Sequence, residues 1–141
     1  MSADRSDREQ IHDVLVRYAT GIDTKSWPLF RTCFTADVHA DYGDTGVWDG
    51  VDAITEYMTG AHEHMIATQH MMSNFVIDVD GDTASAASYV HVVLTLTEDP
   101  LRWVEAVGHY ADELVRAADG WRICNRTYSM TRLLASEGVL G

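Results

Sequence analysis

Apolar positions near the start of the chain recur with the period of an α-helix. Ser6 or Asp7 can cap the N-terminus of this helix, and Gly21 can end it. The apolar residues follow the spacing of one buried helix face, at Ile11, Val14, Leu15, Tyr18 and Ile22. The pattern therefore predicts a helix over about residues 7–21.

Two further helices and a short strand are predicted before residue 66. Ser26 would cap a short helix with Pro28 in its first turn, where a missing N–H costs little. The segment "DVHADYGD" predicts a short strand that ends in a turn. Asp52 would cap a third helix, whose buried face would be formed by Ile54, Tyr57, Met58, Ala61 and Met65.

The apolar period changes to two in the second half of the chain. Strands rich in Val, Ile, Thr, Tyr and Trp are predicted over 69–79, 84–97, 102–117 and 121–132. Asp-Gly pairs in "DVDGDTA" and "RAADGW" are typical of hairpin turns. Helices followed by antiparallel strands predict one α+β domain over 1–141, in which a curved sheet forms a cone around about three helices. The interior of such a cone would hold a small ligand.

Alternation assigns the strand residues to two faces, and both faces are largely apolar. On the first long strand it places His70, Met72 and Asn74 on one face, and Phe75, Ile77 and Val79 on the other after any bulge. One face would meet the helices and the other a second subunit, so we expect a homodimer or homotrimer.

Composition narrows the possible partners and location. A net charge of −12 over 141 residues argues against nucleic acid and membrane partners, since both favour a basic surface. No apolar run approaches the roughly 18 residues of a membrane span, and the polar start "MSADRSDREQ" lacks a signal-peptide core. Cys33 and Cys124 are too few for a disulfide framework, which favours buried free thiols and a cytoplasmic protein.

Two polar residues point to chemistry in the interior. Asp23 in "GIDTKSW" follows the first apolar stripe, and His70 in "ATQHMMSN" opens the first long strand. A carboxylate bound to one ring nitrogen fixes the imidazole tautomer and raises its basicity, so that the ring can take a proton from carbon. The spacing leaves an alternative open, in which Asp23 caps the second helix or lies in solvent.

Other candidates carry weaker patterns. The phenol of Tyr42 in "ADYGD" could donate to a substrate oxygen or pack at a strand end, and His91 could be a core histidine. His62 and His64 in "HEH" point in different directions on a helix and lack the H-E-x-x-H spacing, so we expect an exposed helix end and no metal site. The chain has no glycine-rich phosphate loop and no G-x-S-x-G elbow, and we expect no cofactor.

The order of the segments "YATGIDTKSW", "LFRTCFTADVHADYG", "TQHMMSNFVIDVDGDTA" and "GHYADELVRAADGWRICNR" resembles the SnoaL-like branch of the NTF2-like superfamily, and within it the scytalone dehydratases, over about residues 8–132. The resemblance implies an NTF2-like cone. It also implies that Asp23 orients His70, that Tyr42 polarises a substrate carbonyl through a water, and that His91 lines the pocket.

The chain departs from that pattern at two places. Ile22 stands where those enzymes have a tyrosine, and their serine and asparagine on the penultimate strand fall near His109 and Ala111. Tyr18 matches a tyrosine that bile-acid dehydratases of this fold carry five residues before the acid. The expected substrate-binding residues are therefore Tyr18, Asn74, His91 and His109.

The sequence thus predicts a cofactor-independent dehydratase or isomerase that removes a proton alpha to a carbonyl of a hydrophobic cyclic or polyketide-like substrate. One alternative is a non-catalytic binding or assembly module like the small subunit of ring-hydroxylating dioxygenases, with His70 as a core histidine. A polyketide cyclase or an epoxide hydrolase on the same fold is another.

The two apolar sheet faces generate a first prediction. Sedimentation equilibrium at micromolar concentration should give the mass of two or three chains, because an uncovered apolar face favours self-association. A single-chain mass would contradict it.

Overall fold

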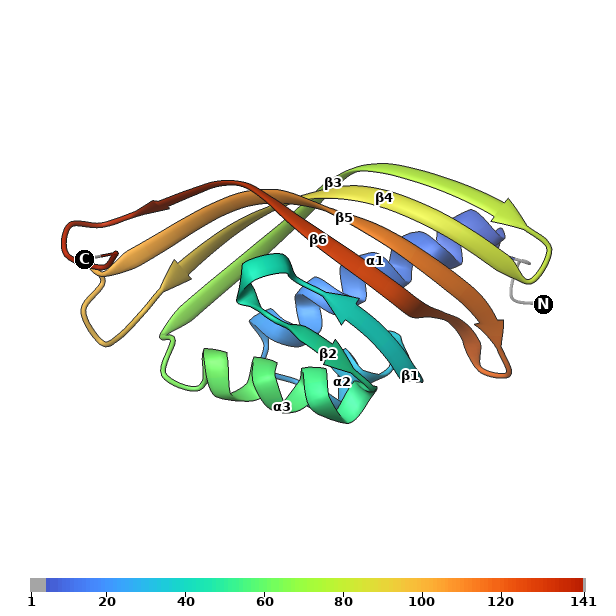
Figure 1. Ribbon diagram of the computed structural model, residues 1–141, viewed down its shortest axis with the longest axis horizontal. Helices are drawn as coiled ribbons and strands as arrows, with labels where there is room; N and C mark the ends of the chain where they lie inside the picture. The colour runs from blue at the N-terminus through green and yellow to red at the C-terminus, as the bar shows by residue number, and fades with distance from the viewer. Residues whose placement is uncertain (1–4, 141) are drawn as a thin grey trace.

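The computed structural model describes residues 5–140, which form three helices packed against one side of a six-stranded mixed sheet. The helices are α1 (Asp7–Asp23), α2 (Trp27–Arg31) and α3 (Val51–His62). Figure 1 shows the four long strands arching over the helices. The strands are β1 (Phe34–Asp41), β2 (Val47–Asp49), β3 (Ala67–Asp80), β4 (Thr83–Thr95), β5 (Trp103–Ala117) and β6 (Gly120–Ala135).

The sheet is strongly curved but not closed, with the strand order β2-β1-β6-β5-β4-β3. All neighbours are antiparallel except β1 and β6, which are parallel. The predicted Asp-Gly turns close the β3–β4 and β5–β6 hairpins, with positive φ angles of 60° at Gly81 and 124° at Gly120. The α+β cone expected from the sequence is confirmed.

The predicted apolar stripe of α1 is fully buried against the sheet. Ser6 caps the helix, since its hydroxyl accepts the backbone N–H of Glu9 at 3.2 Å. The helix continues past Gly21 to Asp23, so Gly21 is not its terminator. A Cβ at Gly21 would lie 2.9 Å from the backbone of Phe30, so the glycine allows α1 and α2 to cross closely.

The structure corrects four details of the strand and helix predictions. A bulge between Ser73 and Val76 keeps Ile77 on the same face as His70, whereas Asn74 is exposed with a φ of 53°. Helix α3 begins at Val51 after Gly50 rather than at a cap by Asp52. Its buried face is formed by Val51, Ile54, Thr55, Met58 and His62, and the three-residue strand β2 was not predicted.

The core lies between α1 and the inner face of the sheet, and no helix within residues 5–140 is long and apolar enough to cross a membrane. Burial of each large apolar side chain contributes about 1.5–3 kcal/mol to the free energy of folding. This contribution holds α1 against β3. This packing brings the last residue of α1 beside the start of β3.

Two helical glycines provide a matched test of the α1–α2 contact. Gly21→Ala should destabilise the protein by roughly 1–3 kcal/mol, because its methyl group meets the Phe30 backbone. Gly60→Ala should stabilise it by about 0.5–1 kcal/mol, because a Cβ there meets nothing within 4 Å. Urea unfolding measures the stability of both variants. Equal effects of the two substitutions would contradict the close contact between Gly21 and the Phe30 backbone.

Candidate active site

Asp23 and His70, which are 47 residues apart in sequence, are in direct contact. Asp23 Oδ1 lies 2.7 Å from His70 Nδ1, and Oδ2 accepts the backbone N–H of His70 at 2.8 Å. Thr68 Oγ1 donates to the same carboxylate at 3.1 Å. Because a carboxylate only accepts, the ring proton lies on Nδ1 and Nε2 carries the lone pair.

Both members of this pair are withdrawn from water. The His70 side chain is 6% exposed and that of Asp23 is 20% exposed. The turn after Asp23 is held by Lys25, whose ammonium donates to the carbonyls of Glu63 and Met65 at 3.4 and 2.9 Å. Lys25 thereby fixes the C-terminal end of α3 against the turn that carries Asp23.

Three tyrosine hydroxyls form a buried cluster next to the pair. The hydroxyls of Tyr18 and Tyr42 are 2.7 Å apart, and Tyr110 donates to Tyr18 at 3.3 Å. The ring of Tyr18 lies edge-on to the ring of His70 with 6.4 Å between centroids. Burial raises the pKa of all three phenols well above the usual value, so each remains a neutral O–H group.

A fully buried ion pair lies against the tyrosines, and the sequence analysis did not anticipate it. Arg126 donates to both oxygens of Asp112 at 2.7 and 2.9 Å. Its guanidinium carbon lies 4.2 Å from the ring centroid of Tyr18 and 3.9 Å from that of Tyr110. The sequence did contain a pattern that could have predicted this pair. Asp112 lies two residues from Tyr110 and from Leu114 on β5, so its carboxylate shares their inner face.

Tyr128 is a fourth tyrosine in the aromatic cluster. Its ring centroid is 5.6 Å from that of Tyr42 and 5.2 Å from that of Tyr110, and the ring is half-buried. A Cβ on Gly108 would lie 2.7 Å from the Tyr128 ring, so the glycine leaves room for it. The sequence analysis missed Tyr128, which lies on β6 opposite Tyr110 on β5.

Beyond the tyrosines the inner face of the sheet is apolar. The register of the strands places four residues side by side across β3, β4, β5 and β6, namely His70, Val92, Ala106 and Leu133. Leu133 is partly exposed to solvent, and Met130 on the same strand is also exposed. The imidazole therefore lies at one end of an apolar row that crosses the four long strands.

His62 also faces this region, contrary to the expected exposed helix end. It is buried, its Nδ1 lies 2.8 Å from the carbonyl of Met58, and its ring centroid is 6.1 Å from that of His70. His64 is exposed, as predicted. The signal was present, since His62 follows Met58 by four residues and Thr55 by seven, on the buried face of α3.

Three residues expected to bind substrate lie away from the dyad. His91 is on the outer face of the sheet, where its Nε2 is 2.7 Å from Glu105, because Val90 and Val92 take the inner positions of β4. His109 is exposed on the outer face in register with Tyr89. Asn74 is exposed at the β3 bulge, so the structure does not bring these residues together with His70.

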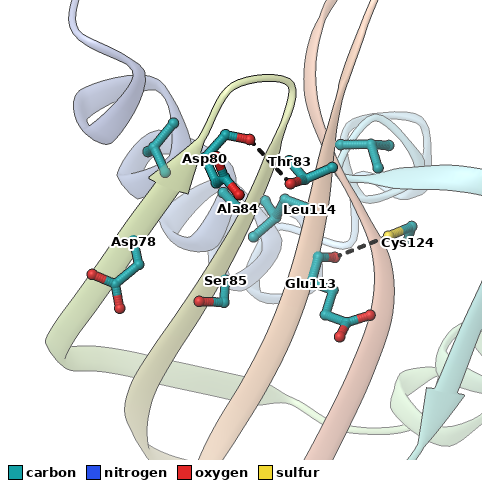
Figure 2. Close-up of a pocket in the computed structure, with 10 residues that line it drawn as sticks. Asp78, Asp80, Thr83, Ala84, Ser85, Glu113, Leu114 and Cys124 are labelled. Atoms are coloured by element: carbon teal, nitrogen blue, oxygen red, sulfur yellow. Dashed lines mark hydrogen bonds between the residues drawn. The ribbon is translucent and has the colours of Figure 1, made fainter.

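Two hollows lie on the outer face of the sheet. One has a volume of about 470 Å³ and is lined by residues that include Asp78, Ser85, Glu113 and Cys124 (Figure 2). Cys124 Sγ donates to the Glu113 carbonyl at 3.4 Å, and burial raises the pKa of its thiol. The second, of about 390 Å³, is adjacent, and neither hollow includes a residue of the dyad. Both cysteines are free, and Cys124 is only partly buried.

Within residues 5–140 no cluster of three or more His, Cys, Asp or Glu side chains has the geometry to hold a metal ion. The polar groups gathered in the interior are two imidazoles, two carboxylates, phenols and a guanidinium. This set can move a proton and donate hydrogen bonds to an oxygen.

Comparison with known proteins gives a family. The family model for the SnoaL-like domain matches residues 3–127. An uncharacterized protein of Mycobacterium tuberculosis is 33% identical over 125 residues, which cover 88% of this chain and 85% of that protein.

Solved structures share the fold. A candidate aromatic ring hydroxylase from Novosphingobium aromaticivorans has a TM-score of 0.84 at 28% identity, covering 92% and 93% of the two chains. A candidate scytalone dehydratase from the same species has a TM-score of 0.83 at 22% identity, covering 91% and 86%. A hexachlorocyclohexane dehydrochlorinase from Novosphingobium barchaimii has a TM-score of 0.81 at 16% identity, covering 93% and 90%. Below 25% identity the likeness is one of fold.

The buried ion pair generates a stability prediction. Asp112→Asn should cost about 3–5 kcal/mol in the free energy of unfolding, because it leaves the Arg126 charge buried without its partner. Asp82→Asn, which breaks an ion pair between Arg116 and an exposed carboxylate, is the matched control and should change little. Chemical denaturation measures the free energy of unfolding of both variants. Similar losses in the two would contradict the expected cost of leaving the Arg126 charge unpaired.

Proposed function

Because the chain belongs to the SnoaL-like family, we propose that it is a cofactor-independent lyase or isomerase that removes a proton alpha to a carbonyl. The structural relatives named as a scytalone dehydratase and a dehydrochlorinase support this class of reaction, since both names describe eliminations. The base would be His70 and its orienting acid Asp23.

The observation that carries the proposal is the hydrogen bond of 2.7 Å between Asp23 and His70 Nδ1. It holds the tautomer in which Nε2 is free to accept a proton, and it stabilises the imidazolium that forms. The backbone N–H of His70 and the hydroxyl of Thr68 fix the carboxylate in turn. A histidine needed only for packing would not require a carboxylate held by three donors.

The reaction would proceed through an enolate. His70 Nε2 takes the alpha proton, and the electrons of the C–H bond form the enolate while its oxygen gains negative charge. Tyr42, hydrogen-bonded to Tyr18, is a candidate donor to that oxygen, because burial keeps its phenol protonated. Return of the proton to another carbon completes an isomerisation, and loss of a beta substituent completes an elimination.

The environment of the base favours a hydrophobic substrate. The surface beside His70 is formed by Val92, Ala106 and Leu133, with the aromatic ring of Tyr128 at its inner border. A cyclic or polyketide-like molecule would bury its apolar surface there at about 25 cal/mol per Å².

The alternatives receive less support. A binding or assembly module is compatible with the likeness to a candidate aromatic ring hydroxylase, but it gives no reason for the dyad. An epoxide hydrolase needs a second acid able to activate water. Asp112 is inside, yet both of its oxygens are bound by Arg126 and neither side chain is exposed. A polyketide cyclase would form the same enolate and would differ only in the step that follows, in which the enolate closes a ring.

Self-association and a cytoplasmic location remain proposals. Exposed apolar side chains on the outer face support the first, among them Met71, Val76, Tyr89 and Val107. Two cysteines without a disulfide are in keeping with a reducing compartment.

Loss of either member of the dyad should strongly slow proton abstraction. His70→Ala and Asp23→Asn should each lower the rate of deuterium exchange at the alpha carbon of 1-tetralone in D₂O by at least about a hundredfold, since general-base catalysis contributes about 10²–10⁴-fold. Proton NMR measures the exchange, and circular dichroism verifies the fold.

A second His–Asp pair on the surface provides the control. His39 Nδ1 lies 2.6 Å from Asp49, and both side chains are well exposed. His39→Ala and Asp49→Asn should leave the exchange rate unchanged. Full exchange activity in the His70 and Asp23 variants would refute the mechanism.

A further inference from the structure

His62 is a second buried imidazole beside the proposed base. It lies on the last turn of α3, is 6% exposed, and has its ring 6.1 Å from that of His70. Lys25 holds this end of α3 against the turn that carries Asp23, so the two imidazoles have a fixed relation. The proposed reaction as described above gives His62 no task.

The tautomer of His62 follows from its single hydrogen bond. Nδ1 lies 2.8 Å from the carbonyl of Met58, and a carbonyl only accepts, so Nδ1 carries the proton. Nε2 is therefore an acceptor, and among residues 5–140 it has no hydrogen-bonding partner. Burial lowers the pKa of His62, and the neighbouring charges of Asp23 and Lys25 act in opposite directions, so the ring is neutral at pH 7.

The two rings thus share one arrangement. In each, Nδ1–H is tied to a protein oxygen and Nε2 presents a lone pair. The ring centroids are 6.1 Å apart, so a molecule bound at His70 would lie close to His62. The group of the bound molecule that faces His70 would be a C–H group that gives up its proton. The group that faces His62 must be a hydrogen-bond donor.

We propose that His62 Nε2 accepts a hydrogen bond from a hydroxyl group on the beta carbon of the substrate, and that His62 thereby selects beta-hydroxy ketones. The proposal rests on the proposed function, because it takes His70 as the base. It makes the reaction a dehydration rather than an isomerisation.

The position of this hydroxyl explains how the leaving group would be protonated. His70 takes the alpha proton, and the C–H electrons form the enolate. When the enolate collapses, a carbon–carbon double bond forms and the bond from the beta carbon to oxygen breaks. The departing oxygen takes the proton back from His70 and leaves as water. By accepting the O–H hydrogen, His62 would turn a lone pair of that oxygen toward the imidazolium.

The competing explanation is that His62 only fastens its own helix through the Met58 carbonyl. Two isosteric variants separate the explanations. The amide nitrogen of His62→Asn can replace Nδ1 and keep the bond to Met58, but nothing replaces Nε2. The amide of His62→Gln reaches the position of Nε2 and supplies an acceptor there. The exposed neighbour His64, changed to Asn, is the control.

The experiment uses 3-hydroxy-1-tetralone, whose dehydration gives 1-naphthol, and 1-tetralone, which lacks the hydroxyl. Dehydration is followed by naphthol fluorescence, and alpha exchange of 1-tetralone by NMR in D₂O. His62→Asn should lower kcat/KM for dehydration about tenfold more than it lowers the rate of alpha exchange, since about tenfold is the value of one hydrogen bond. His62→Gln should recover most of the dehydration rate, and His64→Asn should change neither reaction.

Binding is measured separately, so that the result does not depend on turnover. With ¹⁵N-labelled His70→Ala protein, which lacks the proposed base, 3-hydroxy-1-tetralone should shift the Nε2 resonance of His62, and 1-tetralone should not. An unshifted Nε2, or full dehydration activity in His62→Asn with a loss in His62→Gln, would overturn the role of His62. Failure of the proposed function appears differently, as alpha exchange that survives His70→Ala.

Discussion

The hydrogen bond between Asp23 and His70 joins the end of α1 to the start of β3, and the arrangement of the interior depends on it. The carboxylate is mostly withdrawn from water, and leaving it unpaired there would cost several kcal/mol. Its three donors all come from β3, so the register of helix and strand is fixed by the same contacts that set the tautomer of the imidazole. Packing and chemistry share one constraint at this point.

A second polar layer lies next to the dyad. The Arg126–Asp112 pair is enclosed by the rings of Tyr18 and Tyr110, and the hydroxyl of Tyr18 is hydrogen-bonded to those of Tyr42 and Tyr110. The ring of Tyr18 also lies edge-on to that of His70, so this layer adjoins the imidazole. Burial keeps the phenols in their neutral form, because it raises their pKa values. The row of Val92, Ala106 and Leu133 across the sheet, by contrast, is apolar.

The longer elements and their order could be predicted from the chain because each is marked by a local period, whereas the three-residue strand β2 is too short to show one. The stripe from Ile11 to Ile22 and the alternation after residue 69 depend only on helix and strand geometry. The face on which each β3 side chain lies could not be predicted beyond Ser73, because one extra residue in a bulge reverses the alternation of faces. His62 was misplaced by taking Ala61 and Met65 as the buried side of α3, when the spacing from Thr55 and Met58 was equally available.

The sequence by itself determined the α+β class, the hairpins and the family resemblance that singled out Asp23, His70, Tyr18 and Tyr42, because these depend on local periods and short motifs. Only the tertiary structure decided which polar groups meet. The contact between Asp23 and His70 joins a helix and a strand whose relative register no local pattern encodes. Arg126 faces Asp112 across one hairpin, but a register shift between Glu113 and Leu114 lies between that pair and the turn. The same register places His91 and His109 outside, because a strand position one residue away faces the opposite side of the sheet.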